Sequence, residues 1–239
     1  MLLSAHADLA ISSGWFEKEC PRHLVTVPAY AISRVPVTAG EWNVFAAASG
    51  IPAAAGDDRL PVSGIGWVRA QEFCRWFSGE YGFAVTLPSE SQWERAARGD
   101  DAREYPWGDS YEPGRANLAD LGVGGPLPVG NFPAGASPFG VLDLAGNVDE
   151  WTSTVYAPYP GAPAAVPDAE PWAADVHVTR GGSWIHHRDL ARCARRHGAY
   201  GADLRGVGFR LAAPFTADLS GHTLRRSFSV AQPVQGGLP

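Results

Sequence analysis

Arg180-Gly181-Gly182-Ser183-Trp184, followed later by Gly208-Phe209-Arg210, are the two stretches that decide how this chain folds. Short strands are predicted at about 178–180 and 208–212. The residues between the two stretches, 184–207, combine Arg, His and Tyr side chains and follow no apolar period of 2 or 3.6. We therefore expect strands that form a framework on either side of an irregular, exposed segment.

Helices are predicted at three places before these strands. Two capping boxes, in which a hydroxyl and a carboxylate or amide satisfy free backbone donors, begin helices that reach about Ala48 and Arg98. An apolar stripe predicts a third helix over 68–81, which Gly82 ends. The two boxes are Thr38-x-x-Glu41 and Ser89-x-x-Gln92.

The outer parts of the chain give weaker signals. Alternation over His23–Val27 predicts a strand whose extended course continues to Val37. After Pro214 the polar tail could add one strand through Leu224, Phe228 and Val230. We accordingly divide the chain into an N-terminal segment (1–22), one domain (23–213) and a C-terminal tail (214–239).

The composition favours one loop-rich domain. The 239 residues are 45% hydrophobic, enough for one sizeable core, and 28 Gly with 20 Pro favour turns over long helices. A net charge of −6 without a Lys/Arg run argues against a nucleic-acid partner. Residues 1–11 lack the basic start and apolar length of a signal peptide or membrane span, so no membrane partner and a cytoplasmic location are expected.

The cysteines support that location. Cys20, Cys74 and Cys193 are too few and too scattered for a disulfide framework. We expect all three to be buried free thiols.

Further motifs keep a fixed order from about Pro36 to Leu211 and carry a family resemblance. Together with the two opening stretches, the chain resembles the formylglycine-generating enzyme (sulfatase-modifying factor) family. The resemblance implies an α+β, C-type-lectin-like domain with short strands and about three helices. The further motifs are Leu87-Pro88-Ser89-Glu90-Ser91-Gln92-Trp93-Glu94, Pro106-Trp107-Gly108 and Gly146-Asn147-Val148-Asp149-Glu150-Trp151.

The family's chemistry requires residues that this chain lacks. In formylglycine-generating enzymes two cysteines just after Gly-Gly-Ser hold Cu(I), a soft ion that prefers thiolates. When this sequence is matched to that pattern, the positions of the two copper-binding cysteines correspond to His186 and to a residue near Ala191. Cys193 matches a family position that does not bind copper. We expect no copper and no formylglycine-generating activity. In secreted relatives the positions of Cys74 and Cys193 pair with cysteines that are absent here, which agrees with a reducing compartment.

Other metals remain as alternatives. His186 and His187 could offer imidazoles to a metal, but neighbouring side chains of an extended segment point to opposite faces. Related sulfoxide synthases bind iron through an additional helical domain that this sequence does not contain.

A structural calcium ion is the expected cofactor. Family members hold calcium at the motif that contains Asn147, Val148 and Glu150, which supplies the hard oxygen ligands that Ca²⁺ prefers. A second family site corresponds to Asn117-Leu118, with only Asp120 close to the required acid. Alternatively, Asn147 and Glu150 bond the backbone of their own loop.

The segment 184–207 is the predicted recognition face, because in the implied fold it returns across one exposed side. Side chains that join apolar area to directional donors suit the binding of a protein or small molecule. Variable proteins of diversity-generating retroelements share this layout, with randomised residues between a Gly-Gly-Ser-Trp-like motif and a closing Gly-Phe-Arg. The predicted ligand-binding residues are Trp184, Ile185, His186, His187, Arg188, Asp189, Arg192, Arg195, His197, Tyr200 and Arg205.

The leading hypothesis is thus a non-catalytic binding module, with a retroelement variable protein as its narrower form. A metal-dependent oxidase or oxygenase with non-cysteine ligands is the alternative, and a structural assembly subunit is a third reading. The sequence indicates no oligomeric state.

Overall fold

A computed structural model describes residues 6–9, 11, 13–162, 175–198, 203–215 and 228–231. Its α-helices are α2 (Ala39–Ser49), α3 (Trp67–Tyr81) and α4 (Glu90–Arg98). Its 3-10 helices are η1 (Ala7–Leu9), η2 (Ser13–Glu19), η3 (Ala119–Leu121), η4 (Pro133–Gly135) and η5 (Arg188–Ala191). Its strands are β1 (Tyr30–Ser33), β2 (Asp149–Val155), β3 (His177–Arg180), β4 (Val207–Phe209), β5 (Ala212–Pro214) and β6 (Phe228–Ala231).

The three predicted helices are confirmed, together with their caps. The Thr38 hydroxyl accepts the Glu41 N–H at 3.2 Å, and the Thr38 N–H donates to the Glu41 carboxylate at 2.8 Å. Ser89 and Gln92 make the same reciprocal bonds at the start of α4. Because a capping box is made by residues three apart, it can be read from the sequence alone.

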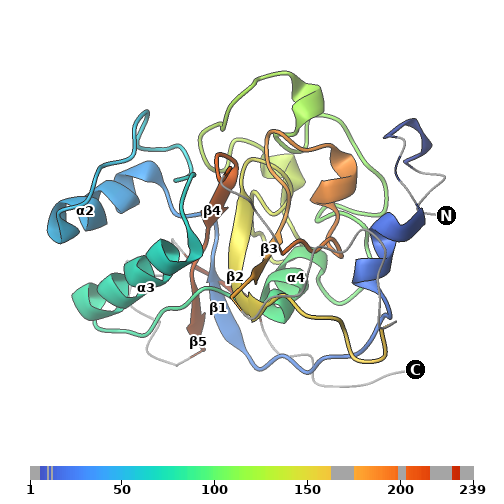
Figure 1. Ribbon diagram of the computed structural model, residues 1–239, viewed down its shortest axis with the longest axis horizontal. Coiled ribbons are helices and arrows are strands. Elements are labelled where there is room, and N and C mark those ends of the chain that lie inside the picture. The colour runs from blue at the N-terminus through green and yellow to red at the C-terminus, as the bar shows by residue number, and fades with distance from the viewer. Residues whose placement is uncertain are drawn as a thin grey trace.

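Two three-stranded sheets carry the motifs (Figure 1). One has the order β5-β1-β6 and is antiparallel. The other has the order β3-β2-β4, in which β2 runs antiparallel to β3 and parallel to β4. Its register places Glu150 opposite both Arg180 and Gly208, so three motifs far apart in the sequence meet on neighbouring strands.

The strand predicted at His23–Val27 is wrong. Among the described residues these five join no sheet, and Leu24 is 93% exposed. Pairing begins only at Tyr30, after Pro28, which has no N–H to donate to a ladder. The strand predicted in the tail is confirmed at β6, which pairs with β1, while Leu224 lies outside the described residues.

The core has two main apolar clusters, on the two faces of β1. Ala31 packs with α2 and α3 around Trp42 and Phe73. Tyr30 and Ile32 face the other way and pack with Trp93 of α4. Figure 1 shows the corresponding arrangement, with α2 and α3 together on one side of the strands and α4 on the other.

Cys74 and Cys193 are buried, as expected, but Cys20 is exposed. Cys20 directly follows η2 at the surface, where its thiol donates only to the Phe16 carbonyl, at 3.7 Å. Among the described residues, none of the helices has the length and apolar character needed to cross a membrane.

Candidate functional site

A network of buried arginines and carboxylates includes residues within the 184–207 segment and on both sides of it. The five arginine side chains are each at most 1% exposed, and each contacts a carboxylate that is itself almost fully buried. Such charges are tolerated inside a protein only when they are paired and hydrogen-bonded. The arginines are Arg180, Arg192, Arg195, Arg196 and Arg210.

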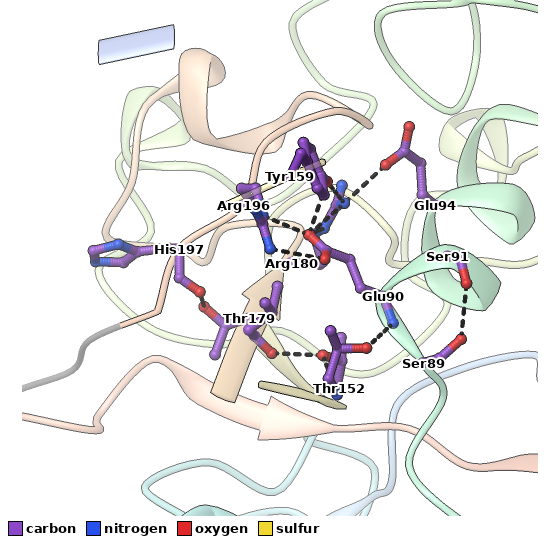
Figure 2. Close-up of polar contacts among 12 residues, drawn as sticks. Ser89, Glu90, Ser91, Glu94, Thr152, Tyr159, Thr179, Arg180, Arg196 and His197 are labelled. Atoms are coloured by element: carbon purple, nitrogen blue, oxygen red, sulfur yellow. Dashed lines mark hydrogen bonds and ion pairs between the residues drawn. The ribbon is translucent and has the colours of Figure 1, made fainter. Parts of the chain in front are cut away.

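Glu90, the first residue of α4, joins two of these arginines (Figure 2). Its carboxylate accepts from Arg180 Nη2 at 2.8 Å and from Arg196 Nε at 2.8 Å, and the Tyr159 hydroxyl donates to it at 3.1 Å. Burial raises the pKa of Glu90, but the charges of the two arginines outweigh burial and hold the pKa below its ordinary value. Glu90 therefore connects α4 to β3 and to the segment after it.

Glu150 and Arg210 form a second, fully buried pair. Arg210 donates from Nε and from Nη2 to the two Glu150 oxygens, each at 2.6 Å, and Trp93 Nε1 donates to Glu150 at 2.6 Å. The remaining Arg210 donors reach the carbonyls of Ser33 and Leu142. This pair links both sheets to α4.

The predicted calcium ligands do not fit a calcium site in this arrangement. Both Glu150 oxygens are held by Arg210, and Val148 is buried. Asn147 Oδ1 accepts from Asn117 Nδ2 at 3.1 Å and from the Leu127 N–H at 2.9 Å. These partners lie outside its own loop, so the alternative of bonds to the loop's own backbone is wrong as well. Within the described ranges, no group of three or more His, Cys, Asp or Glu side chains could hold a metal ion.

Close backbone contacts explain why two positions of the motifs are occupied by glycine. A Cβ on Gly146 would lie 2.3 Å from the Asn117 carbonyl oxygen, and one on Gly182 would lie 2.8 Å from that of Leu190. Both residues also have positive φ, 74° and 67°, which favours glycine.

Only part of the predicted recognition face is exposed. Ile185, His187 and Arg205 are exposed. Trp184, His186, Arg188 and His197 are half-buried. The expectation of exposed His186, Arg188 and His197 therefore needs correction, and Tyr200 lies outside the described residues.

Asp189, Arg192 and Arg195 are buried, and η2 of the N-terminal segment contacts the first two of them. Trp15 Nε1 donates to Asp189 at 3.1 Å, and Arg192 Nη1 donates to Glu19 at 2.7 Å. No sequence signal linked Glu19 to Arg192, since the partners are 173 positions apart.

His186 is held by the turn that carries it. Its Nδ1 accepts the Ser183 N–H at 3.0 Å, while the Ala119 N–H donates to its carbonyl at 2.9 Å. Burial, followed by the charge of Arg195, lowers the pKa of His186 to about 4. The neighbouring His187 side chain is exposed, so the two imidazoles do not share one environment.

His186 makes the fold acid-sensitive. Its folded pKa of about 4 lies below the ordinary 6.5, so the unfolded chain binds the proton first as the pH falls. The contribution of His186 to stability is then complete above about pH 6.5 and declines between pH 6.5 and 4, by up to about 3 kcal/mol. His186→Asn keeps an acceptor for the Ser183 N–H but does not titrate. In urea melts between pH 6.5 and 4, the free energy of unfolding of this variant should therefore depend less on pH than that of wild type. Equal pH dependence in both proteins would contradict this role.

Cys74 and Cys193 lie in different apolar clusters. Cys193 packs with Trp93 in one cluster, whereas Cys74 packs with Phe73 in the other. Burial raises the pKa of Cys74 to about 12 and also raises that of Cys193. Ala191, near the second copper position, is completely buried.

Curated relatives include an oxygenase and an inactive enzyme. The chain is 32% identical to hercynine oxygenase of Mycolicibacterium thermoresistibile, over 80% of this chain and 52% of the relative. It is 36% identical to inactive C-alpha-formylglycine-generating enzyme 2 of Mus musculus, over 54% of this chain and 39% of the relative. The chain thus spans about half the length of the hercynine oxygenases it matches.

Solved structures share the fold. PvdO from Pseudomonas aeruginosa is 26% identical, with a TM-score of 0.71 over 86% of this chain and 88% of that one. Variable protein 1 of Treponema denticola is 19% identical, with a TM-score of 0.66 over 81% and 94%. At that identity the second match supports the C-type-lectin-like fold alone. Residues 4–214 match the sulfatase-modifying factor enzyme 1-like domain, and the chain belongs to this family.

Proposed function

We propose that this protein is a non-catalytic, ligand-binding member of its family. One observation carries the proposal: where the resemblance places the two copper-binding cysteines, this chain has a hydrogen-bonded His186 and a buried Ala191. The remaining thiol of the region, Cys193, is enclosed in the core. The inactive mouse relative supports the proposal, because a family member can lack the activity.

The proposed binding face is the exposed part of the 184–207 segment. Ile185, His187 and Arg205 are exposed, and Arg188 lies beside them, paired with Asp8 and stacked over the Tyr111 ring. These side chains combine apolar area with directional donors, as binding surfaces require. The buried arginines beneath them would hold the face in one shape.

A four-residue variant tests this face. Alanine at the exposed Ile185, His187 and Arg205 should change stability by no more than about 0.5 kcal/mol per position, because surface side chains contribute little. Alanine at the half-buried Arg188 also removes its pair with Asp8, which adds about 0–1 kcal/mol. The variant should nevertheless lose a partner that wild type captures from cells and binds again after purification, as measured by calorimetry.

A control on α2 and on the far end of α3 separates this effect from general surface changes. Val44→Ala with Tyr81→Ala alters two exposed side chains of these helices and should leave binding intact. Retained binding in the four-residue variant would count against the proposed face.

The narrower proposal, a retroelement variable protein, predicts a pattern of natural variation. Copies of the gene sequenced from one population should differ at exposed positions such as Ile185, His187 and Arg205. They should not differ at Arg192 or Arg195, because a change there would leave a buried carboxylate unpaired. Variation spread evenly over both groups would refute this role.

An oxygenase is the second candidate, favoured by the 32% identity to hercynine oxygenase. The catalytic alternative can be tested directly. Purified protein supplied with copper or iron and oxygen should leave both a Cys-x-Pro-x-Arg peptide and, with a thiol present, hercynine unchanged by mass spectrometry. Conversion of the cysteine to an aldehyde, or oxidation of hercynine, would overturn the non-catalytic proposal.

A further inference from the structure

Arg195 is a buried arginine with an unused pair of donors. Its Nη1 donates to both Asp149 oxygens, at 2.8 and 2.7 Å. Its Nε and Nη2 are buried and have no hydrogen-bond partner among the described residues. These two N–H groups point from the same edge of the guanidinium, which is the edge that binds a carboxylate through two parallel bonds.

The other arginines of the network show what this edge binds. Arg196 and Arg210 each place Nε and Nη2 on the two oxygens of one carboxylate, and Arg180 places both on one oxygen of Glu90. Within one protein, the same edge of three arginines therefore holds a carboxylate. Arg195 presents that edge without one.

Asp149 cannot turn to fill the edge. Thr179 Oγ1 donates to its Oδ2 at 3.2 Å, and the Gly182 N–H donates to its Oδ1 at 3.3 Å. With Arg195 Nη1 on both oxygens, the carboxylate is fixed on three sides. Asp149 therefore leaves the Nε–Nη2 edge of Arg195 unused.

The surroundings leave the Arg195 charge incompletely balanced. Burial and then the charge of Arg195 lower the pKa of both His186 and His197, and buried Lys18 lowers that of His197 further. Asp149 and Asp189 act in the opposite sense, but Asp149 is engaged as described and Asp189 accepts from Trp15 Nε1. Leaving charged donors buried and unpaired is costly, so an anion bound at the free edge would stabilise the folded chain.

We propose that the Nε–Nη2 edge of Arg195 binds a small carboxylate anion. Two parallel donors match the two oxygens of a carboxylate. Phosphate could use the same two donors, but it would bury further charged oxygens without donors, which is costly. The site lies beneath the exposed face and adds a second, small-molecule site to the proposed function. Formate and acetate are the smallest probes of this chemistry.

The test uses the full chain in a buffer without carboxylates. Formate and acetate are titrated at constant ionic strength, with chloride and phosphate as separate arms, while the Arg195 Nε–H resonance and the melting temperature are recorded. Formate should shift that resonance to saturation and raise the melting temperature with concentration. Chloride and phosphate should produce neither effect.

Arg195→Lys is the informative variant, because the ammonium still pairs with Asp149 but has no planar edge. Formate should bind it about tenfold to a hundredfold more weakly than wild type, as expected for the loss of charge-assisted bonds. Arg205→Lys, at an exposed arginine of the same segment, should bind formate as wild type does.

No saturable response in wild type, an equal response to phosphate, or undiminished binding by Arg195→Lys would each overturn the proposal. Partner binding by the exposed face is read in a different assay. If the protein binds formate but captures no partner, the Arg195 site stands and the proposed binding face is refuted. If it captures a partner but does not bind formate, the binding face stands and the Arg195 site is refuted.

Discussion

We expect Glu90→Gln to lower the free energy of unfolding by about 3–5 kcal/mol, because removing one charge from a buried network leaves its partners uncompensated. Glu90 binds two arginines at once, as Figure 2 shows, and neither Arg180 nor Arg196 is more than 1% exposed. Only the partly exposed Glu94 would remain as a carboxylate near Arg180. Domains are stable by about 5–15 kcal/mol, so the loss would be a large share of the total.

Urea melts at neutral pH measure this effect, and Glu112→Gln is the matched control. Glu112 pairs with Arg115 at 2.7 Å on the surface, where ion pairs contribute about 0–1 kcal/mol. If Glu90→Gln costs no more than the control, the two arginines do not depend on Glu90 and the network does not hold β3 to α4.

Local signals in the sequence predicted local structure well. Capping residues lie three positions apart, so the starts of α2 and α4 followed from the chain itself. The apolar spacing of α3 and the glycine that ends it are equally local. His23–Val27 failed because alternation reports only a tendency to extend, and a strand also needs a partner.

The segment 184–207 was predicted only in part, for a reason that spacing cannot reveal. An arginine beside polar residues looks the same whether it faces water or a carboxylate brought from elsewhere. Arg192 is buried because Glu19 reaches it from the start of the chain, and Arg195 because Asp149 lies on β2. A charged residue inside a motif, such as Glu90 or Asp149, was the available signal, since a charged side chain in a buried framework is found only when it is paired.

These buried pairs also bear on the proposed function. Arg180, Arg192, Arg195 and Arg196 attach the backbone on both sides of the 184–191 turn to β2, α4 and the N-terminal segment. A face held this firmly can change its exposed side chains without losing its shape. That separation between a fixed base and replaceable side chains is what a recognition surface requires.

Arg210→Met and Glu150→Gln should each lower the free energy of unfolding by about 3–5 kcal/mol, since each leaves the other charge buried. The double variant should be more stable than the sum of the two losses implies, by about 1–3 kcal/mol, because it leaves no buried charge without a partner. Recovery will be incomplete, as the Ser33 and Leu142 carbonyls lose the donors of Arg210.

Urea melts of the two single variants and the double variant, with and without a chelator, measure these losses. Additive losses would mean that the pair is not coupled. A free energy of unfolding that falls in chelator only when Glu150 is present would show that this carboxylate binds calcium after all.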